Sequence, residues 1–192
     1  MISPPRNAEL LCDQWDAIVF DLDGTLVHLH VPWETVENRL RVEMQNVGID
    51  TTNTSVWSLL STAYEQELLD YIEPIINAYE CAGATRSYPL PLSDVVSALS
   101  CPIAVCSLNC EAACRRALAV HSIIDDVDVV IGRDTIRPWK PDPAPLEAAI
   151  ERLPTSPHQP VFIGDSDRDE QTAMAANVDF LPAKDAWHRT QD

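Results

Sequence analysis

The chain alternates short apolar segments with longer segments in which apolar residues recur at helical spacing. The short segments are rich in Val and Ile and are bounded by polar or turn-forming residues; they cover residues 17–20, 103–106, 127–131, 160–164 and 178–181. Such segments are typical of strands buried on both faces of a parallel sheet. Helical patterns follow several of them, at 111–120, at 144–153 and up to about 176. The order therefore predicts an α/β fold with a mainly parallel sheet flanked by helices.

A different pattern separates the first predicted strand from the others. From about Glu34 to Tyr88, apolar residues recur only at helical spacing. Asn53, Thr54 and Ser55 are residue types that cap helix N-termini, and Pro74 is expected to interrupt its helix. We therefore expect an N-terminal extension at residues 1–15 and an α/β core formed by residues 16–30 and 91–192. Residues 31–90 are expected to form an all-helical insertion, the cap.

Composition and charge narrow the class of protein. A chain of 192 residues with 46% apolar residues can bury a sizeable core. It contains no apolar run of membrane-span length and no signal-peptide pattern, so we expect a cytoplasmic protein. The net charge of −17 argues against nucleic acid or an anionic membrane as a partner. The only lysines are Lys140 and Lys184, and an acidic, Lys-poor surface suits both a high-salt habitat and ordinary solubilising charge.

Six cysteines are spread along the chain without a C-x-x-C pair. Four of them crowd one predicted strand–turn–helix segment, at Cys101, Cys106, Cys110 and Cys114. This crowding allows two interpretations, a metal or iron–sulfur cluster and a set of small buried packing residues, and we favour packing. A cytoplasmic setting disfavours disulfides, so we expect free thiols.

The first predicted strand ends in two aspartates. Asp21 and Asp23 follow Phe20 directly, and Gly24 comes next. Open α/β sheets bind their ligands at this end of the strands, and glycine permits a sharp turn that lets both carboxylates point to one side. Like charges this close require a cation, a shared proton or both.

Further polar residues stand at or beyond the ends of later strands. Ser107 precedes a predicted helix, where a hydroxyl can bind a phosphate oxygen beside free backbone N–H groups. Lys140 lies in a Pro-rich loop, and Asp165 and Asp169 follow the strand at 160–164. Four aspartates against one lysine favour a hard divalent cation with oxygen ligands, and Mg²⁺ suits that description.

These residues resemble, in order, the four signatures of the haloacid dehalogenase-like (HAD) phosphohydrolases. The matching segments are Asp-Leu-Asp-Gly-Thr at 21–25, Ser107, Lys-Pro-Asp-Pro at 140–143 and Gly-Asp-x-x-x-Asp at 164–169. The resemblance covers about residues 15–181 and is closest to the branch of phosphoglycolate phosphatase and β-phosphoglucomutase. It implies a Rossmann-like core with an inserted helical cap that closes over the active site. Many relatives have Asn directly after the serine, whereas here Leu108 precedes Asn109, so no role is assigned to that asparagine.

The resemblance implies a Mg²⁺-dependent phosphatase that hydrolyses a small phosphorylated metabolite through an aspartyl-phosphate. Asp21 would be the nucleophile and Asp23 the general acid and base. Asp21, the backbone carbonyl of Asp23, and Asp165 would hold the metal.

The remaining signature residues would act on the phosphate or through a neighbour. Ser107 and Lys140 would bind the transferring phosphate, and Asp169 would orient Lys140 or a metal-bound water. His28 and His30 could be metal ligands, but we favour a hinge or solvent position for both. His28 is close enough in sequence to Asp23 to reach a leaving group.

Two other functions fit the same residues. A phosphomutase of the β-phosphoglucomutase type retains all of them, and a non-catalytic phosphate-binding or partner-binding protein could keep the fold without turnover. Dehalogenase chemistry is disfavoured because it needs no acid at Asp23. Nine acidic residues against three arginines between Val31 and Leu90 mildly disfavour polyanionic substrates. The oligomeric state is left open.

Overall fold

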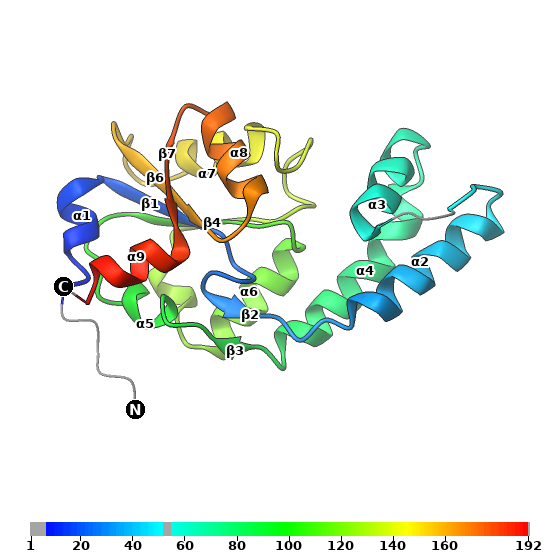
Figure 1. Ribbon diagram of the computed structural model, residues 1–192, viewed down its shortest axis with the longest axis horizontal. Helices are drawn as coiled ribbons and strands as arrows, with labels where there is room; N and C mark the ends of the chain where they lie inside the picture. The colour runs from blue at the N-terminus through cyan, green and yellow to red at the C-terminus, as the bar shows by residue number, and fades with distance from the viewer. Residues whose placement is uncertain (1–6, 52–54, 192) are drawn as a thin grey trace.

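The computed structural model describes residues 7–51 and 55–191 and consists of an α/β core from which three helices project to one side (Figure 1). The core sheet has five parallel strands in the order β5-β4-β1-β6-β7. Their bounds are Ala17–Phe20 for β1, Ile103–Cys106 for β4, Val129–Ile131 for β5, Pro160–Gly164 for β6 and Asp179–Pro182 for β7. The predicted α/β class with a parallel sheet is confirmed, and the strand bounds differ from the predicted ones by at most two residues.

Helices cover both faces of this sheet, which explains why all four residues of β1 are buried and apolar. Ile18 and Phe20 point into one apolar cluster, and Ala17 and Val19 point into the other. The first cluster includes residues of α1 (Leu10–Gln14), α5 (Ser93–Val96), α6 (Glu111–Val120) and α9 (Ala183–Arg189), and the second includes residues of α7 (Ala144–Glu151) and α8 (Asp167–Ala175). A short 3-10 helix, η1, spans Ile124–Asp126. Asn177 follows α8 with a φ of 53°, the left-handed conformation common after a helix end.

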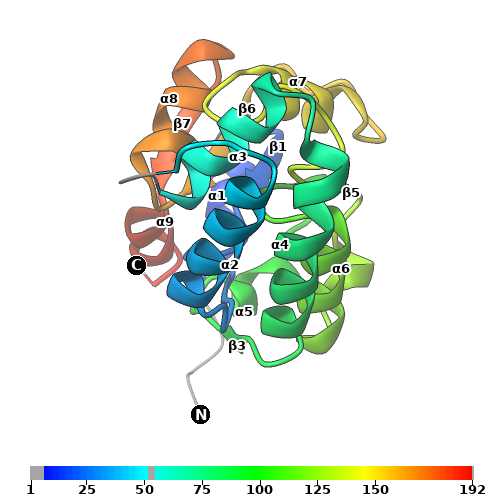
Figure 2. The same cartoon turned by 90° about the vertical axis from the view of Figure 1, so that its right-hand side faces the viewer.

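The helical insertion has an apolar core of its own. It consists of α2 (Trp33–Asn46), α3 (Val56–Glu65) and α4 (Leu69–Ala84), which lie in front of the sheet in Figure 2. Ser55 caps α3 by accepting a hydrogen bond from the backbone N–H of Ser58 at 3.3 Å, as predicted, whereas Asn53 and Thr54 lie outside the described residues. The predicted interruption at Pro74 is wrong, because α4 continues through it. The buried side chains of Ile72 and Ile76, on either side of Pro74, offset the lost backbone hydrogen bond.

Two short strands connect the core to the insertion. β2 (Val27–His28) and β3 (Tyr88–Pro89) form an antiparallel pair, so the outgoing and returning segments lie side by side. Two-residue strands carry no periodicity, and the sequence did not predict them. From this junction α4 extends along α6 (Figure 1), so one helix belongs to the insertion and also packs on the core.

The cysteines follow the sequence prediction only in part. Cys106, Cys110 and Cys114 are buried free thiols within the apolar clusters, which agrees with a packing role. The expectation of free thiols throughout is wrong, because Cys12 and Cys101 form a disulfide. These two residues are 89 positions apart in sequence and meet because α1 packs beside the segment that leads into β4.

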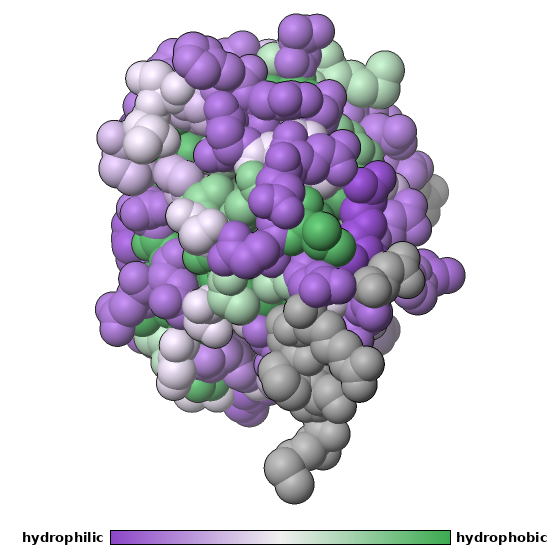
Figure 3. Space-filling model, turned by 90° about the vertical axis from the view of Figure 1, so that its left-hand side faces the viewer, coloured by the Kyte–Doolittle hydropathy of each residue, from purple (hydrophilic) through white to green (hydrophobic). Residues whose placement is uncertain are grey.

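The surface is consistent with the acidic composition. The face opposite the insertion is mostly hydrophilic, with small, separate hydrophobic areas (Figure 3). None of the helices in the described part of the chain is long and apolar enough to cross a membrane.

Candidate active site

The candidate site lies at the carboxyl end of β1, the central strand, between β4 and β6. Asp21 directly follows β1, and its backbone N–H bonds the Ile163 carbonyl at 2.8 Å. Asp165 directly follows β6. The loop after Asp21 passes close to it, because a Cβ added at Gly24 would lie 2.3 Å from Asp165 Oδ2, and Gly24 has a φ of +96°. Only glycine satisfies both conditions, so Gly24 brings the two strand ends together.

Three carboxylates converge at this point. Asp21, Asp165 and Asp169 each offer an oxygen, and these oxygens all lie within 4.8 Å of one another. Asp21 and Asp169 are buried, whereas Asp165 is exposed to the cleft. No other group of three or more His, Cys, Asp or Glu side chains within residues 7–51 and 55–191 has this geometry. We call these three residues, together with Lys140, the carboxylate cluster.

Lys140 supplies the positive charge of the cluster. It lies on the loop between β5 and α7, and its Nζ donates to Asp21 Oδ1 at 2.8 Å, to Asp169 Oδ1 at 2.6 Å and to the Cys106 carbonyl at 3.1 Å. Burial lowers the pKa of the ammonium group, but the two carboxylates raise the pKa by more, so Lys140 stays charged. All of its hydrogen-bonding capacity is used within the cluster.

Asp169 is held by its own helix as well as by Lys140. Its Oδ2 accepts hydrogen bonds from the Ser166 backbone N–H at 3.1 Å and from Ser166 Oγ at 2.6 Å, which closes a capping box at the start of α8. Because both oxygens of Asp169 already accept hydrogen bonds, Asp21 and Asp165 are the better ligands for a cation.

The electrostatics of the cluster call for a further positive charge. Burial raises the pKa of Asp21 to about 7, and the neighbouring Asp169 and Asp165 add to this increase, which outweighs the opposing effect of Lys140. Burial and Asp169 likewise raise the pKa of Asp165. A divalent cation would neutralise this excess, and the all-oxygen donor set fits Mg²⁺.

Asp23 lines the same cleft from the loop after β1. Its Oδ1 accepts a hydrogen bond from the Leu29 backbone N–H at 2.8 Å and lies 3.7 Å from His28 Nδ1. Burial raises the pKa of Asp23, and the Leu29 N–H and then His28 oppose that shift. His28 is exposed at the junction with the insertion, where its ring lies 5.0 Å from that of Tyr88, and His30 is exposed as well. Neither histidine belongs to the carboxylate cluster, and the favoured hinge position matches this placement.

Ser107 directly follows β4 and is buried. Its Oγ donates to Asn109 Oδ1 and accepts from the Asn109 backbone N–H, both at 3.2 Å. Asn109 Nδ2 donates in turn to Glu80 Oε1 at 3.3 Å. Asn109, which received no role from the sequence, therefore supports the Ser107 hydroxyl.

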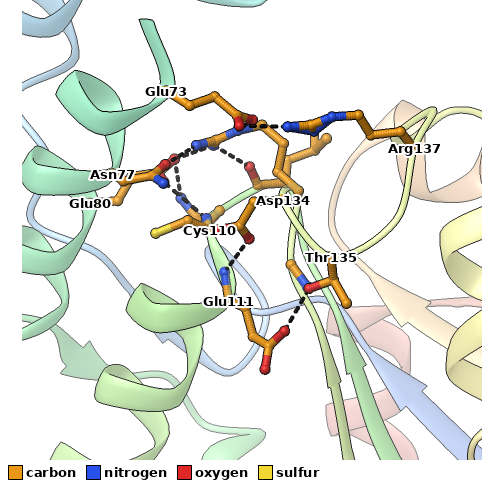
Figure 4. A network of polar contacts seen from close by, with 12 residues as sticks. Glu73, Asn77, Glu80, Cys110, Glu111, Asp134, Thr135 and Arg137 are labelled. Atoms are coloured by element: carbon orange, nitrogen blue, oxygen red, sulfur yellow. Dashed lines mark hydrogen bonds and ion pairs between the residues drawn. The ribbon is translucent and has the colours of Figure 1, made fainter. Parts of the chain in front are cut away.

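A second buried group of charges fastens α4 to the loops of the site (Figure 4). Arg133, which is 1% exposed, donates to Glu80 Oε1 at 2.7 Å, to the Leu108 carbonyl at 2.8 Å and to Asn77 Oδ1 at 2.5 Å. Glu80 Oε2 accepts from the Cys110 backbone N–H at 2.9 Å, at the start of α6. We call the set the Arg133 network; its members are Glu73, Asn77, Glu80, Arg133 and Arg137.

The other end of the Arg133 network reaches the loop that carries Lys140. Glu73 lies 3.6 Å from Arg133 and accepts a hydrogen bond from Arg137 at 2.5 Å. One helix of the insertion therefore contacts both loops expected to bind phosphate. This arrangement could not be predicted from the sequence, because the two glutamates resemble ordinary charges of a solvated helix face.

The carboxylate cluster lines a cleft of about 360 Å³ between the core and the insertion. Its core side includes Ser107, Lys140 and the aspartates at 21, 23, 165 and 169. The insertion contributes Trp33 from α2 and Trp57 from α3, and α8 adds Arg168. Helical periodicity did not indicate which side chains of the insertion face the site. The volume suits a small metabolite.

Comparisons with known proteins bear on the family and the fold of the chain. Residues 18–183 match the family model described as haloacid dehalogenase-like hydrolase. The phosphoglycolate phosphatase of Cereibacter sphaeroides is 30% identical over 181 residues, covering 85% of this chain and 82% of that protein. That of Rhodospirillum rubrum is 29% identical over 189 residues, covering 84% and 76% respectively. Among solved structures, CbbY from Rhodobacter sphaeroides in complex with phosphate has a TM-score of 0.63 at 19% identity, covering 88% of this chain and 85% of that one.

Proposed function

The chain belongs to the haloacid dehalogenase-like hydrolase family, and we propose that it is a Mg²⁺-dependent phosphatase that hydrolyses a small phosphomonoester of the phosphoglycolate type. The family and the named relatives make it a hydrolase of phosphoric monoesters. The observation that carries the finer proposal is the convergence of Asp21 and Asp165 from two strand ends beside the buried Lys140. A phosphate dianion can approach these carboxylates only when positive charge outweighs them.

The metal would be held by Asp21, the backbone carbonyl of Asp23, and Asp165. When bound, Mg²⁺ supplies charge stabilisation to the phosphoryl oxygens. Lys140, which contacts Asp21, would add positive charge beside the same phosphoryl group, and the Ser107 hydroxyl would donate to a phosphoryl oxygen. Asp169 keeps Lys140 in place.

The reaction proceeds in two displacements. In the first, a carboxylate oxygen of Asp21 forms a bond to phosphorus while the ester P–O bond breaks, and Asp23 gives its proton to the leaving oxygen. In the second, Asp23 takes a proton from water, the water oxygen attacks phosphorus and the aspartyl-phosphate bond breaks. Phosphate is released and Asp21 is regenerated. The raised pKa of Asp23 favours its protonated form at the start of this sequence.

A phosphomonoester panel with and without Mg²⁺ tests the proposal. The wild-type protein should release inorganic phosphate from 2-phosphoglycolate or a related small ester, and EDTA should stop the release. Asp21→Asn should abolish turnover, whereas the exposed Asp185→Asn on α9 serves as the matched control and should leave it unchanged. Turnover that survives in Asp21→Asn would exclude the covalent mechanism.

The two alternative functions give different results in the same experiment. A phosphomutase incubated with an aldose 1-phosphate would produce the 6-phosphate isomer, which phosphorus NMR separates from inorganic phosphate. A non-catalytic binding protein would turn over no ester in the panel, and its ligand binding would survive Asp21→Asn.

We also propose a cytoplasmic location, which the sequence favours. The Cys12–Cys101 disulfide opposes it, because disulfides persist mainly in oxidising compartments. Cell fractionation, combined with alkylation of free thiols before lysis, would decide between the two indications.

A further inference from the structure

We propose that Arg168, which lies over the ring of Trp57, forms the subsite for the leaving group and selects esters whose leaving group carries an anionic substituent. The substituent is an anion that can accept two hydrogen bonds from a guanidinium, either a carboxylate or a second phosphoryl group. The inference rests on the proposed function and names the substrate class of the same site.

Arg168 is the positively charged residue of the cleft whose guanidinium has no hydrogen-bond or ion-pair partner among the described residues. Within residues 7–51 and 55–191, only Lys140 and Arg168 bring positive charge to the cleft lining. Lys140 is fully engaged by Asp21, Asp169 and the Cys106 carbonyl. The guanidinium of Arg168 forms no hydrogen bond or ion pair with any described residue, so its five N–H donors are available to a ligand.

The aromatic residues of the insertion hold this guanidinium in place. Arg168 Cζ lies 5.3 Å from the ring centroid of Trp57, and the Trp57 ring lies 5.9 Å from that of Trp33. Both indoles also pack on the apolar core of the insertion, so they are not free to turn away. An arginine stacked on an indole keeps its N–H groups at the edge of its plane, the arrangement that recognises a carboxylate or phosphate with two hydrogen bonds.

The position of Arg168 matches that of a leaving group. It is the second residue of α8, whose first turn also carries Asp169, so it lies beside the carboxylate cluster on the same helix. A neighbouring cavity of about 380 Å³ shares Trp57, Leu108, Lys140 and Arg168 with the cleft. The cleft therefore continues past Arg168, and a group attached to the phosphate can extend along it.

The charge of the cleft explains why Arg168 would distinguish anionic leaving groups from neutral ones. The cleft is lined by several aspartates, and the described residues of the insertion (31–51 and 55–90) add two indoles and no charged group to it. A leaving group with its own negative charge would be repelled here unless a cation met it. A neutral leaving group needs no such partner. Because the insertion is itself acidic, a single carboxylate is favoured over a second phosphoryl group.

Steady-state kinetics with three esters tests the inference. The probes are 2-phosphoglycolate, ethyl phosphate, which has the same chain length but no carboxylate, and 1,3-propanediol bisphosphate. In Arg168→Gln, we expect kcat/KM for 2-phosphoglycolate to fall roughly 10- to 100-fold, mainly through KM, and kcat/KM for ethyl phosphate to change less than about threefold. Arg152→Gln, which removes an exposed arginine at the end of α7, is the charge-matched control and should change neither.

Each outcome decides the question. An equal loss on 2-phosphoglycolate and ethyl phosphate would mean that the substitution disturbs α8 and Asp169, and it would overturn the inference. No loss on either ester would overturn it as well. A larger loss on the bisphosphate than on 2-phosphoglycolate would keep the subsite and identify its anion as a second phosphoryl group.

Binding separates this inference from the proposed function. If the wild-type protein hydrolyses none of the esters, the proposed function fails. Tryptophan fluorescence can still follow titration of 2-phosphoglycolate and ethyl phosphate with Mg²⁺, because Trp33 and Trp57 line the cleft. Preference for 2-phosphoglycolate that Arg168→Gln removes would support the subsite, and equal binding of the two esters would overturn it.

Discussion

The carboxylate cluster and the Arg133 network are both mainly buried groups of charged side chains, but they differ in the balance of positive and negative charge. In the carboxylate cluster, three aspartates surround one ammonium group, and Asp23 lies on the loop beside them. In the Arg133 network, two glutamates meet two arginines. Both groups join parts of the chain far apart in sequence through hydrogen bonds and ion pairs.

This difference in charge balance indicates that the carboxylate cluster is a binding site and that the Arg133 network has a structural role. A balanced buried group has no need of a ligand, and its role is to hold α4 against the loops of Ser107 and Lys140. An unbalanced group is stable only when a proton or a metal ion joins it, which makes it a binding site. Removing the cation should therefore lower activity in the carboxylate cluster and lower the free energy of unfolding in the Arg133 network.

The largest effects are expected from removing the cation of each group. Lys140→Gln should lower kcat/KM by about 10³-fold, because it removes charge stabilisation from the transferring phosphate, while Mg²⁺ keeps the protein folded. Arg133→Gln should instead lower the free energy of unfolding by about 3–5 kcal/mol, because it leaves the buried Glu80 without its ion-pair partner, whereas Glu73 keeps Arg137. Denaturant titration and steady-state kinetics on both variants measure the contrast. Arg115→Gln, in an exposed pair with Glu111, is the control.

A milder change to the Arg133 network keeps its shape. Glu80→Gln should lower the free energy of unfolding by about 2–3 kcal/mol and raise KM severalfold, because the amide weakens the contacts to Arg133 and Asn109. Glu37→Gln removes a more exposed pair with Arg41 and should cost less than about 0.5 kcal/mol. Equal costs for the two variants would contradict a supporting role for the network.

The pH dependence of Mg²⁺ binding tests the unbalanced group. The pKa of Asp21 is raised to about 7, and a protonated carboxyl is a poor ligand. The apparent Kd for Mg²⁺ should therefore rise by up to about tenfold for each pH unit below 7, and it should level off above pH 8. Isothermal titration calorimetry between pH 5.5 and 8.5 measures it; a flat profile would show that Asp21 does not bind the ion.

The smallest effect concerns the metal-free protein. Because the folded-state pKa of Asp21 lies above its ordinary value of 3.8, the folded state holds this proton more tightly, so the contribution of Asp21 to stability is greatest below about pH 4 and declines as the pH rises to 7. Asp21→Asn should remove this decline. In EDTA at pH 8, the variant should be more stable than the wild type by on the order of 1 kcal/mol, with no gain at pH 4. Urea titrations at both pH values check the sign.

The two groups also differ in how far the sequence could predict them. Asp21, Asp165, Ser107 and Lys140 stand at or beyond strand ends, and parallel strands bring such positions to one edge of the sheet. The strand pattern therefore predicts that these four residues lie close together.

The Arg133 network could not be predicted in this way. Glu80 and Arg133 are 53 positions apart and belong to a helix and a loop whose packing no periodicity encodes. The same limit applies to Trp33 and Trp57, whose direction depends on how the insertion sits on the core. The Cys12–Cys101 disulfide was missed because compartment, rather than geometry, guided the expectation.

The scarcity of lysine gives the protein a practical property. Lys140 is 3% exposed and keeps its proton, so amine-selective reagents will not modify it. Lys184 is exposed on α9 and is not among the residues that line the cleft. Among the lysine side chains, an amine-selective dye or resin would therefore couple to Lys184 alone, whereas the terminal α-amino group reacts with the same reagents and would have to be blocked first.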